Sequence, residues 1–309
     1  MRVLVTGATG FVGRRLVPAL LDAGHDVVAF VRDAGRYTGP SGVDVVEGDV
    51  FDSATLAPAM AGVDAAYYLV HSMRSGGDFE ARDRLAARNF VAAASDAGVE
   101  RVVYLGGLGE ERDQLSPHLR SRREVEHLLG SGSFELTTLR AAIIVGSGSA
   151  SFDMVQQLAK RLPVMVTPQW VETKCQPIAI DDVVAYLVGV LDHPETAGET
   201  YEIGGPDVLT YREMLQQVGV HLGHAPRIVS VPVLSPRLSS YWIGLVTDVD
   251  TDVARPLIEG LKNPVVVNDD RIRDIIPIDE TPFDVAVERA LHDEPESLHI
   301  PIESKTNAS

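Results

Sequence analysis

The sequence predicts an α/β protein in which one parallel β-sheet is covered by helices on both faces. Short apolar, β-branched segments alternate with helical segments along the first half of the 309-residue chain. These strand segments lack the alternation of polar and apolar residues, so each strand is expected to be buried on both faces. A glycine-rich turn between the first strand and the first helix is the third observation, because it lets a helix pack close to the preceding strand.

The elements expected in the first half alternate regularly between strand and helix. Strands are expected at Arg2–Val5, Asp26–Val31, Val43–Glu47, Ala65–Val70, Val99–Leu105 and Phe134–Ile144. Helices with apolar residues at helical spacing are expected at Gly13–Ala23, Ser53–Met60, Phe79–Ala97 and Leu119–Leu129. Residues 1–146 are therefore predicted to form a doubly wound parallel sheet domain.

The second half is less regular, and part of it is expected to rejoin the main sheet. Strands are expected at Gln176–Ile180 and Thr200–Ile203, so residues 176–206 are assigned to the sheet domain. Further helices are expected at Phe152–Arg161, Asp181–Leu191 and Thr210–Val220.

The rest of the second half is predicted to form a smaller C-terminal substrate cap. Residues 147–175 and 207–300 make up this cap, and the polar residues 301–309 form a disordered tail. The apolar stretch Ser239–Val246 is interpreted as core, with a lid over an apolar substrate or a partner surface as alternatives.

Composition excludes several classes of function. The chain has 27 basic and 44 acidic residues, a net charge of −17, and such a surface repels nucleic acid. The lone Cys175 leaves no disulfide within the chain, and the nine scattered histidines predict no metal site.

Composition also bears on the cellular setting. The chain has no signal peptide and no apolar run of about 18 residues, so we expect a cytoplasmic protein without a transmembrane segment. Only four of the 27 basic residues are lysines, which favours a halophilic protein. GC-rich codon usage with ordinary acidic solubility is the alternative.

The strongest motif follows the first predicted strand. Gly7, Gly10 and Gly13 form a G-x-x-G-x-x-G turn that leads directly into a helix. The first glycine permits the tight turn, the second lets backbone N–H groups approach a phosphate, and the third lets the helix pack on the sheet. The helix N-terminus then faces the negative phosphates. The motif predicts a Rossmann-type dinucleotide site made of Gly7, Ala8, Thr9, Gly10, Phe11, Val12 and Gly13. A glycine turn without a ligand is the alternative.

The end of the second predicted strand distinguishes the two nicotinamide cofactors. Arg32 lies 19 residues after Gly13, where its guanidinium could hold a 2′-phosphate, and this favours NADP(H) over NAD(H). Asp33 could instead bind the ribose 2′-OH of NAD if Arg32 pointed away. Two solvated charges at a strand end are the third interpretation.

Two further strand ends are expected at the cofactor. After the third strand, Asp49 could hydrogen-bond the adenine while Val50 packs on its ring, and a capped turn is compatible with both. Leu69, Val70 and His71 end the fourth strand and are expected beside the cofactor ribose. His71 is also a second candidate for catalysis, against a structural histidine bonded to a backbone carbonyl.

These motifs resemble the atypical and extended short-chain dehydrogenase/reductase superfamily. The resembling segments are TGATGFVG at residues 6–13, VRD at 31–33, GDVFD at 48–52, PIAIDDV at 177–183 and YEIGGP at 201–206. Within the superfamily the chain is most similar to the NAD(P)H-binding, NmrA-like and YbjT-like branch. That branch includes nucleoside-diphosphate-sugar epimerase-like proteins and lies near an accessory subunit of respiratory complex I.

The resemblance covers about residues 1–220 and implies two classes of function. The first is an NADP(H)-dependent oxidoreductase or epimerase-like enzyme acting on a small carbonyl substrate. The second is a non-catalytic NADP(H)-binding sensor or accessory subunit.

The chain departs from the superfamily at its catalytic signature. Catalytic members carry Y-x-x-x-K in the helix after the fifth strand, and spacing places His118 at the tyrosine and Arg122 at the lysine. The serine expected at the end of that strand is also missing, because residues 105–108 read LGGL.

Two interpretations of this departure stay open. His118 could act as a replacement general acid, because imidazole titrates near neutral pH. Arg122 would then hold ribose hydroxyls, and its charge would lower the pKa of a neighbouring imidazole. Alternatively the dyad is lost, with His118 at the surface and Arg122 a positioning contact or a solvated charge.

Overall fold

The computed structural model describes residues 1–72, 79–109, 116–161, 164–231, 261 and 263–293. Within these residues seven strands form one sheet. They are β1 (Arg2–Thr6), β2 (Asp26–Val31), β3 (Asp44–Glu47), β4 (Ala65–Tyr68), β5 (Arg101–Gly107), β6 (Glu135–Ala141) and β11 (Thr200–Ile203). All neighbouring pairs are parallel, in the order β11-β6-β5-β4-β1-β2-β3. The predicted doubly wound α/β fold is therefore confirmed.

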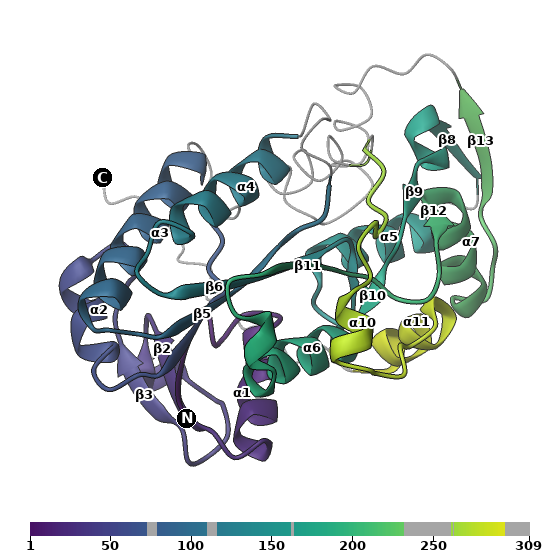
Figure 1. Cartoon of the computed structure of the whole chain (residues 1–309). Helices are drawn as coiled ribbons and strands as arrows, with labels where there is room; N and C mark the ends of the chain where they lie inside the picture. Colours follow the sequence, from purple (N-terminus) through teal and green to yellow (C-terminus); the bar gives the residue numbers. More distant parts are fainter. Residues whose placement is uncertain (73–78, 110–115, 162–163, 232–260, 262, 294–309) are drawn as a thin grey trace, which may run out of the picture.

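Helices cover both faces of this sheet (Figure 1). One face carries α2 (Ser53–Ala59), α3 (Phe79–Asp96) and α4 (Pro117–Leu129), and the other carries α1 (Gly13–Asp22) and α6 (Ile180–Asp192). Successive residues of a strand point to opposite faces. Leu4 of β1 accordingly belongs to one core with Phe90 of α3, whereas Val5 belongs to the other core with Leu16 and Leu187. Burial on both faces explains why the strand segments are almost entirely apolar.

The carboxyl ends of β1 and β4 meet where the order of the sheet reverses. The chain runs from β1 outward through β2 and β3, then crosses to β4 on the other side of β1. The hydroxyl of Thr6 donates to the carbonyl of Tyr67 (2.8 Å) and accepts from the N–H of Leu69 (3.2 Å). This contact joins the two strand ends at the position where doubly wound sheets bind their ligands.

A second lobe lies beside the carboxyl edge of the sheet and has a core of its own. Its helices are α5 (Ala150–Arg161), α7 (Tyr211–His221) and α11 (Phe283–His292), whereas α10 (Ile272–Ile275) packs against β11 and belongs to the core of the main sheet. Its short strands are β7 (Ile144–Val145), β8 (Val164–Pro168), β9 (Lys174–Cys175), β10 (Ile178–Ala179), β12 (Leu209–Thr210) and β13 (Arg227–Val231). Phe152, Met214 and Val287 are fully or almost fully buried in this core.

The segment 176–206 divides between the sheet and this lobe. β11 pairs with β6 in the main sheet, whereas β10 pairs with β7 in a separate two-stranded sheet. The expected strand Gln176–Ile180 is shorter than predicted because helix α6 already begins at Ile180. Pro177 also lacks the N–H that a sheet ladder needs, and the acidic Asp181 and Asp182 favour a helix start.

Two predictions lie outside the described residues, namely those for Ser239–Val246 and for the tail at 301–309. Within the described part of the chain, every helix is too short or too polar to cross a membrane.

Replacing Phe90 with alanine is expected to destabilise the sheet domain strongly. Phe90 is fully buried and packs edge-to-face on Tyr68 with ring centroids 4.9 Å apart. Loss of this side chain should lower the free energy of unfolding by about 3–5 kcal/mol, measured by urea denaturation. Leu85→Ala on the same helix is the control, because Leu85 is 48% exposed and its loss should cost less than about 0.5 kcal/mol. Equal losses in both variants would contradict the packing of α3 on the sheet.

Candidate functional site

The glycine loop is built by close backbone approach. Gly7 has a φ of +70°, which side chains rarely tolerate, and the N–H of Gly10 donates to its carbonyl at 2.9 Å. A Cβ on Gly13 would lie 2.2 Å from the same carbonyl oxygen, so only glycine lets α1 start this close to the turn. A Cβ on Gly7 would lie 2.9 Å from the carbonyl oxygen of Leu69, so the turn also abuts the chain after β4.

The start of α1 fits a dinucleotide pyrophosphate. Its N-cap, Val12, offers no side-chain acceptor, and no acidic residue lies in the first turn. Among the described residues, none accepts a hydrogen bond from the N–H groups of Phe11 and Val12. An uncapped helix N-terminus with free N–H groups is suited to bind an anion.

The two charges after β2 differ in their surroundings. Asp33 forms an ion pair with Arg36 at 3.2 Å. Arg32 is exposed, and within the described residues no carboxylate pairs with its guanidinium. A guanidinium at this strand end is therefore free to meet an anionic group, while the neighbouring carboxylate is already engaged.

The turn after β3 is held by local hydrogen bonds. The carboxylate of Asp49 accepts from the N–H of Phe51 at 3.0 Å, which is the capped turn expected from the sequence. Val50 is buried, and its carbonyl accepts from Asn89 on α3 at 2.9 Å. These contacts order the turn, and the second carboxylate oxygen of Asp49 accepts no hydrogen bond from the residues that the structure describes.

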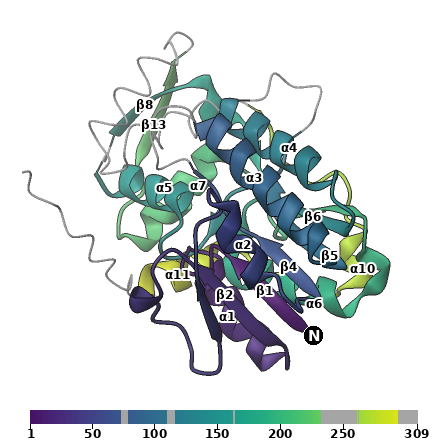
Figure 2. The same cartoon turned by 90° about the vertical axis from the view of Figure 1, so that its left-hand side faces the viewer.

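The chain after β4 meets a buried carboxylate from α3. Asp83 receives three hydrogen bonds, from His71 Nδ1 (3.2 Å), the N–H of Ser72 (2.9 Å) and the hydroxyl of Ser121 (3.0 Å). These donors come from two separate segments, the chain after β4 and helix α4. Helices α3 and α4 lie side by side along one face of the sheet (Figure 2), which brings the groups together.

A second histidine completes this arrangement, which we call the histidine cluster (Asp83, His71 and His118). The rings of His71 and His118 lie 5.1 Å apart between centroids, with 46° between their planes. Nε2 of His71 and Nδ1 of His118 are shielded from solvent, and neither has a hydrogen-bond partner among the described residues. His118 as a whole is half-buried, so its Nε2 is the nitrogen on the accessible side.

Burial and the charges of neighbouring side chains determine the protonation states of the histidine cluster. Burial is the main cause that lowers the pKa of both imidazoles. Arg122 lowers the pKa of His71 further, and His71 and Arg122 together lower that of His118 further. For Asp83, burial alone would raise the pKa, but the hydrogen bonds from His71, Ser72 and Ser121 outweigh it and the net shift is downward. At neutral pH the cluster therefore holds one carboxylate and two neutral imidazoles.

Arg122 lies against the end of β5. Its guanidinium donates to the carbonyl of Leu105 at 3.1 Å, and its own carbonyl accepts from the hydroxyl of Tyr104 at 3.2 Å. A Cβ on Gly107 would lie 2.9 Å from the side-chain end of Leu119, so a serine there would require this side chain in the first turn of α4 to shift.

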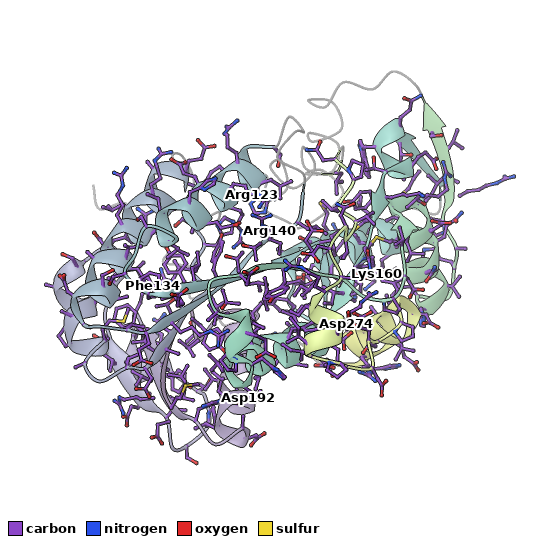
Figure 3. All side chains as sticks on the ribbon, in the orientation of Figure 1. Arg123, Phe134, Arg140, Lys160, Asp192 and Asp274 are labelled. Atoms are coloured by element: carbon purple, nitrogen blue, oxygen red, sulfur yellow. The ribbon has the colours of Figure 1, made fainter. Side chains whose placement is uncertain are left out.

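An ion-pair cluster fixes α4 on the sheet. Glu126 of α4 bonds both Arg123 of the same helix (3.4 Å) and Arg140 of β6 (3.1 Å). Figure 3 shows the two arginines lying near one another between α4 and the sheet. Arg123 also donates to the carbonyl of Gly109, just beyond β5, at 2.5 Å. Buried charges held in this way restrict the helix that carries His118.

The structure brings together residues that the sequence singled out and adds two that it missed. His71 and His118 share one cluster, and His71 bonds a carboxylate, so the expected backbone-carbonyl partner is wrong. Asp83 and Ser121 were missed. A signal for Asp83 exists in the helical stripe of α3, because it shares one face with Ala86, Ala87, Phe90 and Ala94, where a lone acid is unusual.

Comparison with known proteins places this geometry in a family. A family model described as NAD(P)H-binding matches residues 7–162. A (4-alkanoyl-5-oxo-2,5-dihydrofuran-3-yl)methyl phosphate reductase of Streptomyces griseus is 30% identical over 76% of this chain and 79% of its own length. A mitochondrial NADH dehydrogenase [ubiquinone] 1 alpha subcomplex subunit 9 of Arabidopsis thaliana is 28% identical over 74% of this chain. The match spans only 60% of that subunit.

A solved structure shows the same fold. An NADPH-dependent quinone oxidoreductase of Escherichia coli superposes with a TM-score of 0.74 at 19% identity, covering 94% of this chain and 99% of the other. The family match, the reductase relative and the common fold agree with the resemblance carried by the glycine loop. The chain belongs to the NAD(P)H-binding family, among the atypical short-chain dehydrogenase/reductase-like proteins.

Proposed function

We propose that the protein is an NADP(H)-dependent oxidoreductase or epimerase-like enzyme that acts on a small carbonyl substrate. The observation that carries this proposal is the histidine cluster beside the glycine loop. Two half-buried imidazoles lie at the carboxyl edge of the sheet, on and beside the chain that leaves Leu69 at the glycine loop, and each has one shielded nitrogen without a partner among the described residues. Buried polar atoms without partners are rare in folded proteins and concentrate at functional sites.

His118 is the proposed proton donor to the carbonyl oxygen. The bound cofactor supplies the hydride, while the protein orients the substrate and provides the proton. Burial, followed by His71 and Arg122, lowers the pKa of His118 well below its ordinary value, so its resting form is neutral. A neutral imidazole can still polarise a carbonyl through its N–H, and Arg122 is the proposed contact for ribose hydroxyls.

NADP(H) is the proposed cofactor because of the two side chains after β2. Arg32 is exposed and available to a 2′-phosphate, whereas Asp33 is held by Arg36 at 3.2 Å. A free guanidinium attracts a phosphate, and an engaged carboxylate competes less for the 2′-OH of NAD. Leu69, Val70 and His71 are the proposed ribose neighbours, and Asp49 with Val50 the proposed adenine neighbours.

A non-catalytic NADP(H)-binding sensor or accessory subunit is the second candidate. The similarity to a subunit of a respiratory NADH dehydrogenase favours it, as does the replacement of the tyrosine–lysine pair. The similarity to a bacterial reductase over 79% of that protein favours the enzyme.

The composition leads to one proposal about the setting, a salt-rich cytoplasm. A halophilic protein with net charge −17 should gain thermal stability when KCl is raised to about 2 M, because the salt screens its self-repulsion. An unchanged or lower Tm would favour ordinary acidic solubility.

Replacing Arg32 with alanine should weaken NADPH binding and leave NADH binding nearly unchanged. A charge-assisted contact to a 2′-phosphate is worth about 1.5–3 kcal/mol, so the Kd for NADPH should rise about ten- to hundredfold. Fluorescence titration of the purified protein measures both constants. Arg2→Ala, which removes an arginine from the opposite end of β1, is the control. Equal weakening of both cofactors by Arg32→Ala would contradict the 2′-phosphate assignment.

Replacing His118 with alanine should lower kcat for NADPH-dependent carbonyl reduction by about 10²–10⁴-fold. The Kd for NADPH should stay within about twofold, because the glycine loop is untouched. NADPH oxidation at 340 nm over a panel of ketones, aldehydes and quinones provides the assay.

His127→Ala is the matched control for this variant, because His127 is exposed at the other end of α4. Tight NADPH binding without turnover of any carbonyl by the wild-type protein would favour the accessory subunit.

A further inference from the structure

We propose that Asp83, His71 and His118 form a proton relay, in which Asp83 positions His71 and His71 passes the proton to His118. The proposal rests on the proposed reductase function and deepens it, because it assigns the source and path of the substrate proton.

The first step concerns the tautomer of His71. An ionised carboxylate only accepts hydrogen bonds, so its contact with Nδ1 of His71 at 3.2 Å places a proton on that nitrogen. The neutral ring then carries its lone pair on Nε2, which is buried without a partner. Ser72 and Ser121 donate to the same carboxylate at 2.9 and 3.0 Å, and they keep Asp83 ionised and oriented.

The second step joins the two rings. The unpartnered atom of His71 is Nε2 and that of His118 is Nδ1, and the ring centroids are 5.1 Å apart. No hydrogen bond joins these two nitrogens in the structure, so the relay requires a ring movement that brings them within hydrogen-bond distance. A single N–H···N hydrogen bond would then satisfy both nitrogens at once. His118 is then left with Nε2 on the accessible side, toward a substrate.

The third step is the balance of protons during carbonyl reduction. The resting cluster is neutral, and it is loaded when a solvent proton adds at Nε2 of His118 while the Nδ1 proton of His118 passes to Nε2 of His71. In this loaded relay His71 carries protons on both nitrogens and His118 carries one on Nε2. The cofactor supplies the hydride to the carbonyl carbon, and the carbonyl oxygen takes the Nε2 proton of His118. Nδ1 of His118 takes the Nε2 proton of His71. His71 becomes neutral, and its remaining proton stays on Nδ1, hydrogen-bonded to the carboxylate of Asp83. One proton from solvent, taken up at Nε2 of His118 while its Nδ1 proton returns to His71, restores the relay.

The charges around the cluster explain why two rings are used. Arg122 disfavours a positive charge on either imidazole, whereas Asp83 favours one on His71. The spare proton is therefore stored on the ring that contacts the carboxylate, one ring away from the substrate. In the described part of the chain, Tyr68 of β4 and Tyr104 of β5 also interact with Asp83, and burial raises the pKa of both, so both stay neutral.

Asp83→Asn tests the relay directly. An asparagine amide can donate to Nδ1 of His71, which would move the ring proton to Nε2 and break the chain, the effect described for the equivalent change in a serine-protease triad. We expect nitrogen-15 NMR of histidine-labelled protein to show His71 as the Nδ1–H tautomer in wild type and as the Nε2–H tautomer in the variant. We also expect kcat for carbonyl reduction to fall about 10²–10⁴-fold with NADPH affinity unchanged.

The pH dependence provides a readout that a structural role would not move. Asp83 raises the pKa of His71, so its neutralisation should move protonation of His71 to lower pH. The rise in the rate of reduction on acidification should move to lower pH in the same direction.

Two further variants complete the experiment. His71→Gln keeps a donor for Asp83 but cannot carry the proton, so it should lose a similar factor in kcat, and the double variant should be no worse than the poorer single one. Asp96→Asn removes a carboxylate from the exposed end of the same helix and is the control.

The outcomes separate the relay from the proposed function. A wild-type enzyme that reduces carbonyls, together with folded Asp83→Asn and His71→Gln variants of undiminished kcat, overturns the relay alone. An Nε2–H tautomer of His71 in the wild-type protein also overturns the relay, whatever the activity. Wild-type protein that binds NADPH and reduces no carbonyl overturns both.

Discussion

The arrangement of the site depends on the burial of one carboxylate. Asp83 lies in the core between α3, α4 and the chain after β4, and an ionised group there is stable only while its donors stay in place. Losing a donor to a buried charge costs several kcal/mol, more than typical side-chain contacts contribute. The carboxylate thereby ties the register of two helices to the end of a strand, and it sets the separation of the two histidine rings.

The cation at position 122 has the opposite effect on proton transfer from the corresponding lysine in the superfamily that this chain resembles. A cation beside a tyrosine lowers the pKa of the tyrosine because it stabilises the phenolate, and this helps proton transfer. A cation beside a histidine disfavours the imidazolium, and Arg122 has that effect on His118. The proposed replacement of tyrosine and lysine by His118 and Arg122 therefore needs a compensating anion. Asp83 provides it, because its negative charge raises the pKa of both His71 and His118.

Much of the fold and of the cofactor turn could be predicted because their signals are local. Gly7, Gly10 and Gly13 lie within seven residues, and the backbone geometry that requires them is formed by the same short segment. The spacing from β5 likewise predicts that His118 and Arg122 occupy the positions of the catalytic signature, and this stays a prediction. Strand Asp26–Val31 has the predicted bounds, because an apolar β-branched run between polar turns permits little else.

The partners of these residues could not be predicted, because they are distant in sequence. Asp83 and Ser121 are 38 positions apart, and their contact depends on how α3 and α4 pack across the sheet. The length of the expected strand Gln176–Ile180 failed for a related reason, since the start of α6 at Ile180 competes with strand pairing. Sequence patterns identify which face of a helix is buried, but they do not specify what that face meets.

Cofactor binding and proton transfer use different parts of the molecule, and this separation is informative. The dinucleotide turn relies on β1 and α1, whereas the histidine cluster relies on α3, α4 and the chain after β4. A protein that only binds the cofactor needs the first part alone, and a family can therefore include both a reductase and a subunit of a respiratory enzyme. A buried Asp–His pair contributes little to stability that an apolar pair of similar size would not provide. Its presence together with unpartnered ring nitrogens is therefore better explained by chemistry than by folding, and this favours the enzyme over the accessory subunit.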